Sequence, residues 1–77
     1  MAKLPQVTGN ELVKALQKEG FEIVRQRGSH VQMRKHVDGE KVTFPVPVHQ
    51  GQDLKPGTLR GILRLAGMSA ERLRELL

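Results

Sequence analysis

The sequence of 77 residues contains no cysteine, tryptophan or tyrosine and only two phenylalanines. The absence of cysteine excludes a disulfide framework and cysteine-ligated zinc. The scarcity of aromatic residues argues against a stacking platform for single-stranded bases. The chain also has no run of about 18 apolar residues and no signal-peptide pattern at its start. We therefore expect a cytoplasmic protein that does not contact a membrane.

Several catalytic motifs are absent as well. Neither a GxxxxGK[ST] nor a GxGxxG loop occurs, so nucleotide hydrolysis and dinucleotide binding have no support. The acidic residues are dispersed along the chain, which disfavours a pair of carboxylates in acid–base catalysis. The histidines His30, His36 and His49 match no zinc-binding spacing. The sequence therefore predicts neither a metal site nor another cofactor.

Positive charge is abundant and unevenly distributed. Thirteen Lys and Arg residues against eight Asp and Glu give a net charge of +5 and a sequence pI near 10.3. Four of the cations lie between Ile23 and Val37, a segment that contains no acidic residue. Such a surface favours a polyanion through counterion release and electrostatic steering. RNA is the leading candidate ligand.

The pattern of apolar residues predicts one small α+β domain over residues 1–77. Thr8 and Glu11 fit a helix capping box, and Asp38-Gly39 fits a two-residue hairpin turn. The expected elements are a helix over 9–19, strands over 21–27, 30–37 and 41–46, a helix from Pro56 to Gly67 and a short helix after Ser69. This α-β-β-β-α order gives a three-stranded antiparallel sheet with two main helices on one face and a short C-terminal helix.

Alternation at period two divides the strands into two faces. The face expected to turn inward carries Phe21, Ile23, Val31, Met33, Val37, Val42, Phe44 and Val46. His30, Gln32, Arg34 and His36 point the other way. Pro45 and Pro47 cannot donate to a sheet ladder, so the third strand is expected either to lie at an edge or to end there.

His30 is the sharpest candidate for chemistry. Histidine exchanges protons near neutral pH, and RNA carries its own nucleophile in the 2′-hydroxyl group. Gly28-Ser29 is expected to form the turn just before His30, among nearby cations that can stabilise phosphoryl charge. The structural alternative is an ordinary surface histidine, or one that hydrogen-bonds the turn through Ser29.

A set of short motifs resembles one known family over nearly the whole chain. The motifs are, in order, Leu4-Pro5, Thr8-Gly9, Gly20-Phe21, Arg25-Gln26-Arg27-Gly28-Ser29-His30, Pro45-Val46-Pro47-Val48-His49, Lys55-Pro56-Gly57-Thr58-Leu59, Ile62-Leu63 and Ala66-Gly67-Met68-Ser69. This set is similar to the HicA (YcfA-like) toxins, small mRNA interferases of bacterial toxin–antitoxin pairs.

The resemblance implies a fold like that of a double-stranded-RNA-binding domain and ribosome-independent cleavage of mRNA. It also implies a catalytic histidine at His30, with Gly28 shaping the turn, and a HicB-like antitoxin that masks the site. The residues predicted to contact RNA are Arg25, Arg27, Ser29, Arg34, Lys35, Lys55, Arg60 and Arg64.

Two other functions remain compatible with the sequence. The first is a non-catalytic RNA-binding module that uses the same basic face. The second is a protein-interaction subunit whose basic face matches an acidic partner. The sequence leaves open the RNA sequence preferred, a second acid–base group, and whether the chain is a monomer or a homodimer.

Overall fold

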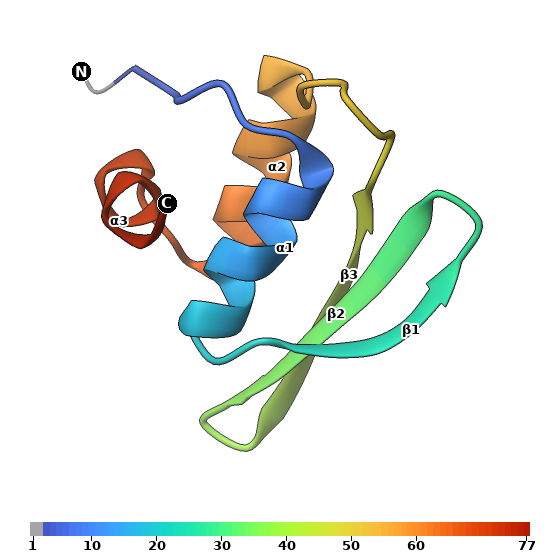
Figure 1. Cartoon of the computed structure of the whole chain (residues 1–77). Helices are drawn as coiled ribbons and strands as arrows, with labels where there is room; N and C mark the ends of the chain where they lie inside the picture. The colour runs from blue at the N-terminus through green and yellow to red at the C-terminus, as the bar shows by residue number, and fades with distance from the viewer. Residues whose placement is uncertain (1–2) are drawn as a thin grey trace.

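The computed structural model describes residues 3–77 as three helices and one antiparallel sheet (Figure 1). The elements are α1 (Gly9–Lys18), β1 (Glu22–Arg27), β2 (His30–Val37), β3 (Glu40–Pro47), α2 (Pro56–Ala66) and α3 (Ala70–Leu76). The expected α+β class and the α-β-β-β-α order are therefore confirmed. None of the helices in this part of the chain is long and apolar enough to cross a membrane.

Residues next to helix α1 determine where it begins and ends. The Thr8 hydroxyl accepts a hydrogen bond from the Glu11 amide, and the Glu11 carboxylate accepts one from the Thr8 amide, which is the expected capping box. Gly20 follows the helix with a φ of 103°, a conformation that other residues adopt only with strain. The capping box that the sequence predicts therefore begins the helix, and Gly20 lets the chain turn away just after its end.

The sheet has the order β1-β2-β3, so β2 lies in the centre and β3 at an edge as expected. Asp38 and Gly39 join β2 to β3 with φ angles of 51° and 81°, as a type I′ turn requires. The β1–β2 turn instead has positive φ only at Gly28, at 58°, which is the pattern of a type II′ turn. Glycine or a tolerant residue therefore occupies each strained position.

The core lies between one face of the sheet and the layer formed by α1 and α2 (Figure 1). Val31 and Met33 of β2 and Phe44 and Val46 of β3 are buried there. Phe21 joins them, with its ring centroid 5.2 Å from that of Phe44. The opposite face of the sheet is left uncovered, and His30 stands exposed on it.

Two residues expected in the core, Ile23 and Val37, are exposed. Ile23 pairs with the buried Met33 but is itself 46% exposed, and no residue of β1 is buried. The strand is an edge, its register shifts between Ile23 and Arg25, and the β1–β2 hairpin projects beyond the helices (Figure 1). The helix layer therefore covers the central strand and β3 but leaves this side chain in solvent. Val37, at the far end of β2, is likewise 43% exposed.

Candidate nucleic-acid interface

The turn before His30 is held by hydrogen bonds from two sides. The amide of Val48, just after β3, donates to the carbonyl oxygen of Ser29 at 2.6 Å. The side-chain amide of Gln26 donates to the Gly28 carbonyl oxygen at 3.4 Å. His30 is the next residue and pairs with Arg27 on one side and Pro47 on the other. The backbone that carries the imidazole is therefore fixed by all three strands.

Four side chains line a hollow of about 410 Å³ on the uncovered face of the sheet: Arg25, Arg27, His30 and Gln32. Their placement follows from the register, in which Arg27 is opposite His30 and Arg25 is opposite Gln32. Directly opposed residues in an antiparallel pair project from the same face. The structure thus brings together three of the residues predicted from the sequence, in what we call the His30 hollow.

Within residues 3–77, no carboxylate pairs with the arginines of the His30 hollow. Arg25, Arg27 and His30 are exposed, and within residues 3–77 neither arginine takes part in an ion pair. No acidic residue lines the hollow. The arrangement can bind an anion with two guanidinium groups and present an imidazole to it.

Arg34 shares the outer face but is differently engaged. Its Nη2 and Nε atoms donate to Oε1 of Glu22, the opposed residue on β1, at 2.7 and 3.0 Å. The pair lies further along the strands, and Arg34 does not line the His30 hollow. Its charge is partly balanced before any ligand arrives.

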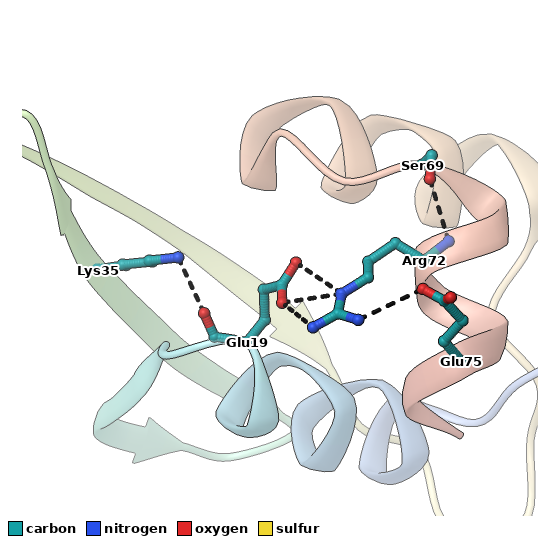
Figure 2. Close-up of polar contacts among 5 residues, drawn as sticks. All are labelled: Glu19, Lys35, Ser69, Arg72 and Glu75. Carbon is teal, nitrogen blue, oxygen red and sulfur yellow. Dashed lines mark hydrogen bonds and ion pairs between the residues drawn. The ribbon is translucent and has the colours of Figure 1, made fainter.

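Lys35 lies on the other face of the sheet, the face that carries Val31 and Met33. Its Nζ donates to the carbonyl oxygen of Glu19 at 2.9 Å and lies 5.5 Å from the centroid of the Phe21 ring. Figure 2 shows the side chain reaching the end of α1. The contact ties β2 to α1 by a cation at a helix C-terminus. The structure therefore separates Lys35 from the His30 hollow.

The three remaining predicted cations are divided between two other depressions. Lys55 lines one beside the end of β3, together with Pro47 and His49. Arg60 and Arg64 line another along α2, on the helix layer. The sheet separates this second depression from the His30 hollow, so the cations do not form one continuous track.

The other histidines do not join His30. His36 lies six residues along β2, about 20 Å away in an extended strand. His49 lies in the depression with Lys55. Over residues 3–77 no three His, Asp or Glu side chains gather where they could hold a metal ion.

Gln32 is the residue of the hollow that sequence reasoning did not select. The period-two pattern already placed it beside His30 on the polar face, so a signal was present. It was passed over because an amide carries no charge. Half-buried between Arg25 and Pro45 of the neighbouring strands, it offers the hollow both a hydrogen-bond donor and an acceptor.

A second group of charged residues is engaged internally, where α3 meets α1 (Figure 2). The Arg72 guanidinium donates to Glu19 at 2.9 and 3.1 Å and to Glu75 at 3.3 Å. These hydrogen bonds hold the pKa of the Glu19 carboxyl below its usual value of 4.5, against the opposing effect of partial burial. We call this group, Glu19, Arg72 and Glu75, the α1–α3 corner.

The fold and the hollow define a class of protein: a small basic α+β domain that exposes a histidine beside two arginines without an ion-pair partner in residues 3–77. The family model of the HicA toxin of bacterial toxin–antitoxin systems matches residues 9–68, and the chain belongs to this family. Membership makes it the toxin of a toxin–antitoxin pair and implies an antitoxin partner. No curated protein and no solved structure matches the chain.

Proposed function

We propose that the protein is an endoribonuclease that cleaves mRNA, with His30 as the general base. The observation that carries this proposal is an exposed imidazole in a hollow whose two arginines have no carboxylate partner. The family match supports a toxic activity, and degradation of mRNA is one that a domain of this size can perform with its own side chains.

In the proposed reaction the 2′-hydroxyl of a ribose attacks the adjacent phosphorus. His30 takes the proton of that hydroxyl, the bond from phosphorus to the 5′-oxygen breaks, and the departing oxygen receives a proton from the protonated His30 or from water. The products are a 2′,3′-cyclic phosphate and a 5′-hydroxyl end. Proton transfer by a positioned histidine typically contributes about 10²–10⁴-fold to such a rate.

Arg25 and Arg27 stabilise the charge that develops on the phosphoryl oxygens. They are two residues apart on one face of β1, hence about 6.6 Å apart along the strand. One guanidinium can hold the scissile phosphate while the other holds a neighbouring phosphate. Fixed donors of this kind stabilise a transition state without reorganising during the reaction.

The proposed RNA interface extends beyond the hollow. Ser29 adjoins His30 and Lys55 lies beyond Pro47, so both border the path of an RNA strand across the hollow. Arg60 and Arg64, which the sequence predicted as RNA contacts, line a separate depression along α2. We propose that the antitoxin is HicB-like and covers the His30 hollow, and that the activity operates in the cytoplasm, where mRNA is found.

The test is incubation with a defined single-stranded RNA in the presence of a metal chelator, followed by analysis of the new ends. We expect 2′,3′-cyclic phosphate and 5′-hydroxyl ends. Exclusive 5′-phosphate and 3′-hydroxyl ends, or a strict need for metal, would contradict the mechanism. RNA binding without new ends would indicate the non-catalytic module, and no RNA affinity at low salt would indicate the protein-interaction subunit.

A further inference from the structure

A second depression, distinct from the His30 hollow, follows helix α2. Arg60, Leu63 and Arg64 of the helix line it, together with Met68 just after the helix and Lys3 and Leu4 near the start of the chain. Its volume is about 500 Å³. We call it the α2 groove.

The α2 groove combines unbalanced charge with an apolar floor. Lys3, Arg60 and Arg64 are exposed, no acidic residue lines the groove, and none of the ion pairs within residues 3–77 involves these cations. Leu63 and Met68 form the floor and are 4% and 7% exposed. Arg60 and Arg64 stand one helical turn apart, where like charges repel each other. Nothing in the described structure relieves that repulsion. An acidic ligand bound between the two arginines would relieve it.

We propose that the α2 groove binds an acidic amphipathic segment of the antitoxin. Apolar side chains of that segment would rest on Leu63 and Met68, while its carboxylates would pair with Arg60 and Arg64. Arginine suits this role because its planar guanidinium binds carboxylates through two hydrogen bonds.

A protein segment fits the α2 groove better than RNA does. An RNA backbone would match the cations but has no aliphatic groups to place against Leu4, Leu63 and Met68. The groove also lacks the aromatic side chains on which exposed bases stack. Apolar contact at the centre and arginine at the rim is instead the composition of protein–protein interfaces.

The proposal rests on membership of the family, which supplies the antitoxin, and not on the nuclease mechanism. The groove lies on the helix layer and the His30 hollow on the opposite face of the sheet. A segment bound in the groove would therefore anchor the partner while another part of it covers the hollow. Two linked contacts raise overall affinity well above that of either one.

The probe is a synthetic helical peptide of about four turns with Leu on one face and Glu flanking it, added to isotope-labelled protein. A matched peptide with Gln in place of every Glu tests the charge, and a single-stranded RNA of equal net charge tests the rival ligand. We expect the acidic peptide to shift the amide resonances of Leu4, Leu63 and Met68. The Gln peptide should bind about tenfold more weakly.

Charge reversal then locates the contact. The double variant Arg60→Glu with Arg64→Glu should bind the acidic peptide at least about tenfold more weakly than the wild type. Lys14→Glu with Arg74→Glu changes the net charge equally at exposed positions outside the groove and should bind nearly as tightly as the wild type. The milder Arg60→Gln with Arg64→Gln removes the charge without reversing it and should show an intermediate loss.

Three results would overturn the proposal. The first is equal weakening in the control variant, which would mean that only net charge matters. The second is no peptide binding at all, and the third is RNA that shifts the groove resonances while the peptide does not. None of these three measurements depends on RNA cleavage. A negative result would therefore reject the groove proposal without affecting the nuclease proposal, which the end-group analysis tests.

Discussion

Two regions of this molecule differ in whether their arginines are paired with carboxylates. In the α1–α3 corner, Arg72 donates to both Glu19 and Glu75 and ties the last helix to the first. In the β1–β2 hairpin, Arg25 and Arg27 stand exposed, with no carboxylate bound. The residue type is the same in both regions. Whether a carboxylate lies within hydrogen-bonding distance decides whether the arginine is paired. Arginines held internally stabilise the fold, while those left free are available to a ligand.

The same contrast occurs within a single strand. His30 and Lys35 both belong to β2 but project from opposite faces of the sheet. Lys35 is engaged by the Glu19 carbonyl oxygen, whereas His30 faces solvent in the hollow. The cations of one basic segment in the sequence therefore lie on two faces of the sheet. On one face they stabilise the fold, and on the other they are open to a ligand.

Removal of the imidazole gives the largest expected effect. His30→Ala should lower the rate of RNA cleavage by about 10²–10⁴-fold, because the general base is lost. Thermal unfolding should be nearly unchanged, because the side chain is exposed. The matched control is His36→Ala, an exposed histidine on the same strand face, which should cleave at the wild-type rate. Full activity of a folded His30→Ala protein would end the catalytic assignment.

Loss of the free arginines should weaken RNA binding. Arg25→Ala combined with Arg27→Ala should lower RNA affinity by about tenfold to a hundredfold. If each guanidinium holds one phosphate, the slope of log affinity against log salt should become shallower by about 1.4. Arg72→Ala removes one positive charge from the α1–α3 corner and should leave both quantities close to wild type. If Arg72→Ala weakened RNA binding equally, the paired and unpaired arginines would not differ in their contribution to RNA binding.

Lys35 tests whether a cation of the hairpin strand acts on the fold. Lys35→Met should lower the free energy of unfolding by about 1–2 kcal/mol, because the hydrogen bond to Glu19 is lost. Arg34→Met breaks a more exposed pair and should lower it by about 0.5 kcal/mol. Denaturant unfolding measures both. A loss of RNA affinity without a loss of stability in Lys35→Met would instead support its predicted role as an RNA contact.

The smallest effect is expected at the α1–α3 corner. Glu19→Gln should lower the free energy of unfolding by about 0.5–1 kcal/mol, because the ion pair with Arg72 is partly solvated. Since the folded pKa of Glu19 is lowered, its contribution is complete above its usual pKa of 4.5 and is lost as pH falls through the lower folded value. Unfolding curves of wild type and Glu19→Gln should therefore converge in acid. If the two curves stayed equally far apart at low pH, the ion pair between Glu19 and Arg72 would not be the source of the difference.

Local chemistry made most of the fold predictable from the sequence. The capping box at Thr8 and Glu11 and the turn at Asp38-Gly39 depend on residues close together in the chain, and both are present. The alternation of β2 correctly placed His30 and Met33 on opposite faces. The same alternation also placed Lys35 with Met33, but its charge suggested a ligand contact and outweighed the pattern.

Other features depend on how distant segments pack together, so neighbouring residues in the sequence do not predict them. Ile23 has the apolar character of a core residue, yet the shift of register and the limited cover of the helix layer expose it. Arg60 and Arg64 were grouped with the hairpin cations because the sequence does not show that a sheet lies between them. The pairing of Arg72 with Glu19 joins residues 53 positions apart and carries no local signal.

The shift of register in β1 also affects how the molecule behaves at high concentration. An edge strand offers unused backbone donors and acceptors to the strands of other molecules, which is a common start of aggregation. Here an irregular ladder and the charges of Glu22, Arg25 and Arg27 oppose such growth. The arginines proposed to bind RNA thus also help to keep copies of the protein apart.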